Sequence, residues 1–253
     1  MTNVVLTEDI SNVRIITLNR PECLNALNNE LIASFLSELR NANNDNSVKV
    51  IILRGAGKAF CAGEDLVDTL KTTQESTEDE KEKYAENLQN ITREMFQSNK
   101  FIIGAIHGWA VGAGFEWTIN CDFSIWTEGS KAFFPEMKWG MFPTGGVTYI
   151  LPHIVGLIKA RELLLFGEKQ SASQLFDLGI AWKVVAENKL MDEALKAANV
   201  IASLPVFSVQ GLKQTINKAC FNHFEDALQM ETKKVLASIE NSGAPELLKS
   251  FNQ

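Results

Sequence analysis

The sequence lacks any apolar run that approaches the ~20 residues needed to cross a bilayer. Residues 1–9 contain no basic side chain before an apolar stretch, and the last residues, SFNQ, are not a peroxisomal address. We therefore expect neither a membrane span nor a secretory signal nor an organelle presequence.

Metal-site and disulfide patterns are also missing. The 4 cysteines form no CxxC pair, and the histidines at 107, 153 and 223 have no metal-ligand spacing. We therefore expect free thiols in a reducing compartment, no metal site and a cytoplasmic protein. The net charge of −7 argues against nucleic acid and anionic membranes as partners, although local cations and helix N-termini can still hold an anionic cofactor.

The composition is that of an ordinary globular protein, with 45% hydrophobic and 22% charged residues. Apolar, β-branched runs predict strands at 13–18, 48–53, 101–106 and 122–126, separated by segments of helical periodicity. This alternation indicates an α/β fold of stacked β-β-α units with a mostly parallel sheet, although no direct sequence repeat is visible.

After about Asn188 only helical patterns follow. We therefore expect a core at 1–188 and a C-terminal helical region at 189–253, which covers the site or makes an oligomer contact. Within the core, residues 71–86 are polar and charged, and a helical pattern begins at Leu88. We interpret 71–86 as a solvated loop that leads into a helix, or as a cover over a ligand site.

Two segments that follow predicted strands are rich in small residues. Small residues at 61–63, within segment 55–66, let the backbone approach a ligand closely, although the segment matches neither a Walker loop nor GxGxxG. Segment 108–116 leads into a helix start, whose N–H groups and partial positive charge favour an anion. A glycine-rich connection and tight helix–sheet packing are the structural alternatives. Cys61 is interpreted as a small buried thiol and not as a nucleophile.

A third segment, 134–146, places Glu136 among phenylalanine, tryptophan and methionine residues. If the carboxyl group is buried there, its ionised form is disfavoured, which suits proton transfer near neutral pH. The alternative is a solvated glutamate in a loop rich in proline and glycine.

The order and spacing of these segments resemble the crotonase family, the enoyl-CoA hydratase/isomerase superfamily, over nearly the whole chain. The matching elements are Asn19-Arg20-Pro21 with 25–28, KAFCAGEDL at 58–66, GWAVGAGFE at 108–116, CDF at 121–123, PEMKWG at 135–140, PTGG at 143–146 and the stretch from 160 to 185. The resemblance implies the crotonase-like spiral of stacked β-β-α units with a C-terminal helical region. It also implies a homotrimer or a dimer of trimers.

The resemblance implies a particular acyl-CoA site. In that family two backbone N–H groups form an oxyanion hole for the thioester oxygen, and the matching residues are Glu64 and Ala113, the latter in place of the usual glycine. The two glutamates of its hydratases match Glu116 and Glu136. The residues expected to bind substrate and CoA, which include the family's CoA segments at 23–24 and 62–66, are Cys23, Leu24, Ala62, Gly63, Asp65, Leu66, Gly112 and Trp139.

Both glutamates favour an enoyl-CoA hydratase, because syn addition of water to a 2-enoyl-CoA needs one group to activate water and a source of a proton. CoA is then part of the substrate, and no cofactor is expected. One alternative is a Δ3-Δ2-enoyl-CoA isomerase with Glu136 as its base. Another is a crotonase-type lyase or hydrolase, whose bulky acyl group would contact Trp109, Trp139, Phe142 and, unless it faces the core, Trp117. Retention of both glutamates argues against a catalytically silent binding protein.

Overall fold

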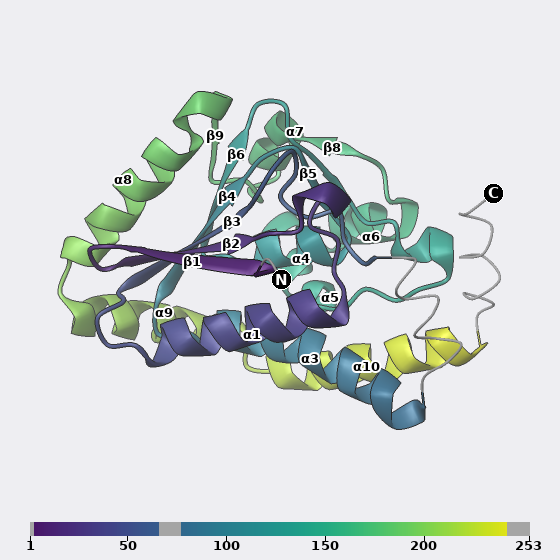
Figure 1. Cartoon of the computed structure of the whole chain (residues 1–253). Helices are drawn as coiled ribbons and strands as arrows, with labels where there is room; N and C mark the ends of the chain where they lie inside the picture. The colour runs from purple at the N-terminus through teal and green to yellow at the C-terminus, as the bar shows by residue number, and fades with distance from the viewer. Residues whose placement is uncertain (1–2, 66–76, 242–253) are drawn as a thin grey trace.

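The structure is a computed structural model of the chain, and it describes residues 3–65 and 77–241 (Figure 1). The strands of its main sheet follow the order β1-β2-β3-β4-β6-β9. Their bounds are β1 Val5–Ile10, β2 Val13–Leu18, β3 Val50–Gly55, β4 Phe101–Ile106, β6 Phe123–Thr127 and β9 Lys183–Val185. The β1–β2 pair is antiparallel and the other neighbours are parallel, which confirms the mostly parallel sheet.

Helices cover both faces of this sheet. Their bounds are α1 Asn29–Asn44, α3 Glu78–Phe96, α4 Ala113–Asn120, α5 Val147–Val155, α6 Leu157–Phe166, α7 Ala172–Asp177, α8 Leu190–Ser203, α9 Val206–Cys220 and α10 Phe224–Asn241, with 3-10 turns η1 Pro21–Cys23, η2 Glu136–Trp139 and η3 Glu187–Lys189. In β2, Ile16 and Leu18 join the core between the sheet and α1, α3 and α10, whereas Val13 and Ile15 face α8, on the other side of the sheet (Figure 1). Burial on both faces explains why the central strands read as continuous apolar runs.

A second, shorter sheet lies beside the first. It contains β5 (Trp109–Val111), β7 (Lys131–Phe133) and β8 (Gln170–Ser171). Isolated parallel bridges, Leu27 with Glu64 and Cys61 with Ala110, extend this layer to earlier parts of the chain. After several strands of the main sheet, the chain therefore forms a short extended segment that pairs in the second layer, and a helix follows that segment. This is the β-β-α repetition expected from the sequence.

The polar stretch that the sequence analysis treats as a loop is partly helical. Glu78–Glu86 form the first turns of α3, whereas 71–76 lie outside the described residues. A capping box begins the helix: the Glu80 carboxylate accepts the Thr77 N–H at 2.8 Å, and the Thr77 hydroxyl accepts the Glu80 N–H at 3.3 Å. This reciprocal cap stabilises an N-terminus that lacks an apolar face of its own.

The helical pattern after Asn188 is confirmed for α8, α9 and α10, and the further helix expected at 245–251 lies outside the described residues. Among the described helices, none alone has the length and apolar composition of a membrane span; only the bent pair Glu187–Ser203 and Val206–Cys220, at 106°, meets those criteria together.

The core beneath the sheet is anchored by Phe35 of α1, which is fully buried with its ring centroid 4.8 Å from that of Trp117. Phe35→Ala should lower the free energy of unfolding by about 3–5 kcal/mol, because it removes a large buried ring and leaves a cavity. Urea denaturation would measure the loss. Leu6→Ala, on the exposed edge strand β1, is the control and should cost less than about 1 kcal/mol; equal losses would contradict this account of the core.

Candidate active site

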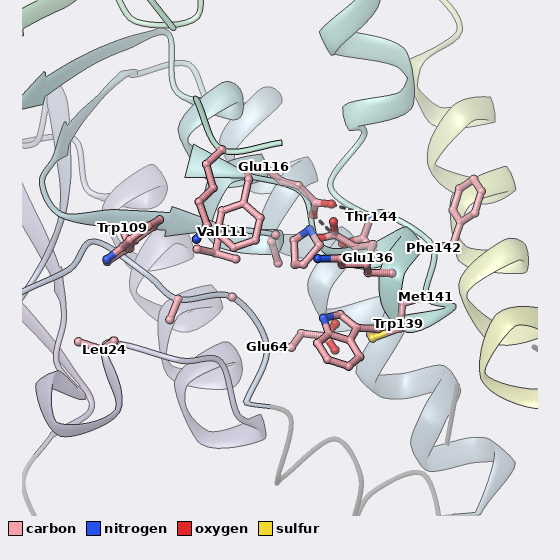
Figure 2. Close-up of a pocket in the computed structure, with 18 residues that line it drawn as sticks. Leu24, Glu64, Trp109, Val111, Glu116, Glu136, Trp139, Met141, Phe142 and Thr144 are labelled. Atoms are coloured by element: carbon pink, nitrogen blue, oxygen red, sulfur yellow. Dashed lines mark hydrogen bonds between the residues drawn. The ribbon is translucent and has the colours of Figure 1, made fainter. Parts of the chain in front are cut away.

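A cavity of about 510 Å³ lies where the second sheet meets the start of α4 and the loop after β7. Its larger apolar lining residues are Leu24, Trp109, Val111, Phe133, Pro135, Trp139, Met141 and Phe142. The charged side chains at its wall are Glu64, Glu116, Glu136, Lys138 and Lys169. Figure 2 shows Leu24 and Trp109 on one side of this cavity and Glu116, Glu136 and Thr144 grouped on the other. Acidic groups in a largely apolar cavity are the usual setting for proton transfer.

Glu116 is buried one turn into α4, and Thr144 holds its carboxylate. The backbone N–H of Thr144 donates to Oε1 at 2.9 Å, and the Thr144 hydroxyl donates to Oε2 at 2.8 Å. Burial raises the pKa of Glu116 well above its ordinary value, the negative charge of Glu136 raises it further, and the Thr144 bonds oppose both effects. The side chain is therefore fixed in direction while its ionisation is disfavoured.

Gly145 lets the loop approach Glu116 this closely. Its φ is +65°, and a Cβ at this position would lie 2.7 Å from Glu116 Oε2. The Asn120 side chain, at the end of the same helix as Glu116, donates to the Gly145 carbonyl at 2.9 Å. A side chain at 145 would therefore displace the carboxylate, the loop or both.

Glu136 enters the cavity from η2. It comes against Gly112, whose φ is +52° and where a Cβ would lie 2.6 Å from Glu136 Oε1. Its Oε2 is buried, and no described group hydrogen-bonds to it. Burial, with the nearby charge of Glu64, raises the pKa of Glu136 to about 8. Glu136 therefore differs from Glu116, because its second oxygen has no hydrogen-bond partner among the residues that the structure describes and faces a cavity that could hold a ligand.

Two backbone positions at the cavity wall are an isolated β-bridge, at Glu64, and a helix start, at Ala113. Leu27 donates to Gly63 O at 2.8 Å and accepts from Asp65 N at 2.9 Å, so strand alternation turns the Glu64 peptide N–H away from Leu27, toward the cavity. Ala113 is the first residue of α4, where a helix leaves its N–H without an intrahelical acceptor. Glu64 and Ala113 therefore both border the same cavity.

The other residues expected to bind substrate divide into three groups. Leu24, Ala62, Gly63, Gly112 and Trp139 line the cavity. Cys23 and Asp65 do not line it: the Cys23 side chain is exposed, and the Asp65 carboxylate pairs with Arg20 at 3.2 Å. Leu66 lies outside the described residues.

Two neighbouring side chains take structural positions. Trp117 is buried against Phe35 and does not line the cavity, so it faces the core. Burial raises the pKa of the Cys61 thiol to about 12, which keeps it protonated and unreactive. In the described parts of the chain, no cluster of three or more His, Cys, Asp or Glu side chains has the arrangement of a metal site.

Thr144 and Lys169 have no role predicted from the sequence. Thr144 was visible in the PTGG motif, but only the fold brings it against a residue 28 positions away. The Lys169 ammonium lies 5.4 Å from the ring centroid of Trp109 and 5.8 Å from that of Phe133, a cation–π arrangement at the cavity wall. Neither contact has a local sequence pattern that would reveal it.

Known proteins share this architecture. The sequence model of the enoyl-CoA hydratase/isomerase family matches residues 8–251. The chain is 32% identical over 231 residues to 1,2-epoxyphenylacetyl-CoA isomerase of Escherichia coli (strain K12), covering 91% of this chain and 88% of that protein. It is 31% identical over 232 residues to short-chain-enoyl-CoA hydratase of Clostridium acetobutylicum, covering 91% and 87%. An enoyl-CoA hydratase structure from Bacillus halodurans has a TM-score of 0.91 at 26% identity, covering 98% of this chain and 99% of that one. These likenesses confirm the crotonase fold.

Burial of Glu136 should make stability depend on pH. Its pKa is about 8 in the folded chain, against roughly 4.3 for an unfolded glutamate. Between these values the folded state binds more protons than the unfolded state, so stability falls as pH rises. From roughly pH 5 to pH 8, wild type should lose a few kcal/mol of unfolding free energy relative to Glu136→Gln, since each pKa unit is about 1.4 kcal/mol.

Urea denaturation of both proteins at the two pH values measures this difference. Glu86→Gln, on the exposed side of α3, is the control and should follow wild type. Parallel pH dependences of wild type and Glu136→Gln would show that the Glu136 carboxyl is not held neutral by burial.

Proposed function

Because the chain belongs to the enoyl-CoA hydratase/isomerase family, we propose that it is an enoyl-CoA hydratase, which adds water across the 2,3 double bond of a 2-enoyl-CoA. The observation that carries this proposal is the convergence of two buried glutamates, Glu116 and Glu136, on one cavity. Each of the two is a group that can accept or deliver a proton near neutral pH. The related short-chain-enoyl-CoA hydratase of Clostridium acetobutylicum supports the same reaction class.

The thioester oxygen accepts hydrogen bonds from the peptide N–H groups of Glu64 and Ala113. Attack of water at C3 moves the π electrons toward this oxygen and forms an enolate. The Ala113 donor belongs to the N-terminus of α4, whose partial positive charge adds to the stabilisation. A single preorganised donor of this kind lowers a barrier by about 3–4 kcal/mol.

We assign the two proton transfers to the two glutamates, one as general base and the other as general acid. With Glu136 protonated, the negative charge that helps to raise the pKa of Glu116 is absent, and the two Thr144 hydrogen bonds favour the ionised form of Glu116. Glu116 then accepts a proton from water as the water oxygen bonds to C3. Glu136 is protonated and gives its proton to C2 as the enolate collapses. The number of protons on the pair is conserved, and one water is consumed per substrate.

The acyl-CoA lies along the length of the cavity. Its CoA portion runs past Leu24, Ala62 and Gly63, where small residues and backbone leave room for the pantetheine arm. Its acyl portion lies among Trp139, Met141 and Phe142. CoA is part of the substrate in this proposal, and the reaction needs no further cofactor.

An isomerase for a bulky acyl-CoA is the second candidate. The aromatic lining of the cavity by Trp109, Phe133, Trp139 and Phe142 favours it, and so does the relation to the Escherichia coli 1,2-epoxyphenylacetyl-CoA isomerase. Isomerisation of a 3-enoyl-CoA needs a single base, for which Glu136 is placed. A shift of a 3-enoyl-CoA to its 2-enoyl isomer, without hydration of the product, distinguishes this function from a hydratase.

Crotonyl-CoA is the first substrate to test. Wild type should remove the absorbance of the conjugated thioester, and Glu116→Gln and Glu136→Gln should each lower kcat by about 100-fold or more, since each removes an acid–base group. Binding of a CoA ester should persist in both variants, and Glu86→Gln should match wild type. Binding of crotonyl-CoA by wild type without loss of the conjugated-thioester absorbance would refute hydration. The next substrates to test would then be 3-enoyl and aromatic acyl-CoAs.

We also propose that the chain assembles as a homotrimer or a dimer of trimers in the cytoplasm, without nucleic-acid or membrane partners. Large apolar side chains are exposed at two separate places: Leu157, Ile158, Leu165 and Phe166 on α6, and Val200, Phe207, Leu212 and Ile216 on α8 and α9. A cyclic trimer joins two different surfaces of each subunit, and these separate apolar surfaces fit that symmetry (Figure 1).

Phe207, whose side chain is 90% exposed, tests the assembly. Phe207→Asp should place a charge in the subunit interface and shift the sedimenting species from about three or six chains to one, since a charge at an apolar interface core is unfavourable. Leu6→Asp on β1 is the matched control and should sediment as wild type does. A wild-type monomer at micromolar concentration would rule out the trimer.

A further inference from the structure

A third buried glutamate lies behind the cavity wall. Glu231 is on α10, is 1% exposed and does not line the cavity. Its Oε2 accepts from Gly146 N at 2.8 Å and from the Gln89 side chain at 3.3 Å, and its Oε1 accepts from Thr148 N at 3.0 Å and from the Thr148 hydroxyl at 2.5 Å. No ion pair joins Glu231 to a cation in the part of the chain that the structure describes. The carboxylate is therefore held entirely by neutral donors.

Two of these donors are backbone N–H groups at the start of α5, which have no acceptor within that helix. The N-cap of α5 is Gly146, which has no side chain with which to cap the helix. Glu231 supplies that cap from another element, and a carboxylate at a helix N-terminus is favourable both as an acceptor and as a charge. The first turn of α5 is thereby fastened to α10.

The segment 144–146 lies between two buried carboxylates. On one side Thr144 donates both of its hydrogens to Glu116, and on the other side Gly146 donates to Glu231. The same segment has no spare room, because a Cβ on Gly146 would lie 2.5 Å from the Phe224 ring of α10. Displacement of α10 or loss of the cap would therefore move Thr144 relative to Glu116.

We propose that Glu231 is a positioning residue for the hydration reaction: by capping α5 it fixes Thr144 against Glu116, so that docking of the C-terminal helix sets the direction of a catalytic carboxylate. This inference rests on the proposed function for its kinetic consequence. The underlying contacts do not depend on it.

A control variant on the same helix separates the positioning role of Glu231 from a role that only holds α10 in place. Helix α10 also carries a partly exposed ion pair, between Glu225 and Arg93 of α3 at 2.6 Å, which shares no residue with the cap or with segment 144–146. Charged or titratable groups that face Glu116 are Glu136 from η2 and Glu231 from α10. Gln89 of α3 and Thr148 of α5, which face Glu231, are neutral. Glu225→Gln is a matched control, because it removes only a partly exposed ion pair, which contributes little to the docking of α10, and leaves the cap intact.

The test is the pH dependence of crotonyl-CoA hydration by Glu231→Gln, from roughly pH 5 to pH 9. We expect kcat to fall about tenfold, with KM within about twofold of wild type, because Glu116 is misplaced while the acyl-CoA contacts remain. Loosening of the Thr144 bonds removes donors that favour ionised Glu116, so the acidic limb of the profile should move to higher pH. Glu225→Gln should leave kcat and both limbs unchanged.

The direction of the shift separates three explanations. Movement to higher pH supports positioning through Thr144. Movement to lower pH would mean that Glu231 acts only through its charge, and an unmoved profile would mean that it is only an anchor; either result overturns the proposal. In a Thr144→Val background, Glu231→Gln should have little further effect on kcat, because the two residues act through one contact.

Two further measurements keep the proposal testable if Glu231→Gln folds poorly or if the enzyme has another activity. Thr148→Val removes one donor to Glu231 but leaves the carboxylate, and should shift the profile in the same direction by less. Hydrogen exchange of segment 143–150 should be faster in Glu231→Gln than in Glu225→Gln, without any substrate. Failure of wild type to hydrate crotonyl-CoA would overturn the proposed function alone, whereas unchanged exchange would overturn the positioning role alone.

Discussion

Burial of the Glu116 carboxylate is the constraint on which the rest of the site depends. A carboxylate taken out of water needs hydrogen-bond donors. Here a single residue, Thr144, supplies two of them, its backbone N–H and its hydroxyl. To bring those donors close, the loop must pass within van der Waals distance of the carboxylate, which requires glycine at 145. The loop then has to begin α5 directly, so the cap of that helix comes from α10. One buried carboxyl group thus determines a helix start, a glycine and a contact with the C-terminal helix.

The spiral explains how segments distant in sequence reach one cavity. Each turn contributes a short extended segment to the second layer, and the parallel bridges at Leu27–Glu64 and Cys61–Ala110 hold successive turns in register. The cavity opens where this pairing ends, beside the peptide of Glu64 and the first residue of α4. Backbone donors at such positions are rigid, because the strands and the helix that carry them are themselves paired and packed.

Much of this site was predictable from the sequence, because its motifs are collinear and contain the residues that line the cavity. The strands at 13–18 and 101–106 have the predicted bounds, since their apolar runs are buried on both faces. The orientation of Trp117 was not predictable: all of α4 is buried, so no polar face marks its direction. The cap from Glu231 was also invisible, because its partners are backbone N–H groups 83 and 85 residues away.

The complete burial of α4 also limits how the protein can change. Every residue from Ala113 to Asn120 is buried, and only Ala113 and Glu116 among them border the cavity, so most substitutions in this helix would disturb the packed core and destabilise the fold. Trp139, Met141 and Phe142, by contrast, are only partly buried at the cavity wall and have room to vary. Evolution or engineering of a new acyl preference therefore has an accessible route through 139–142, while the helix that carries the carboxylate stays constant.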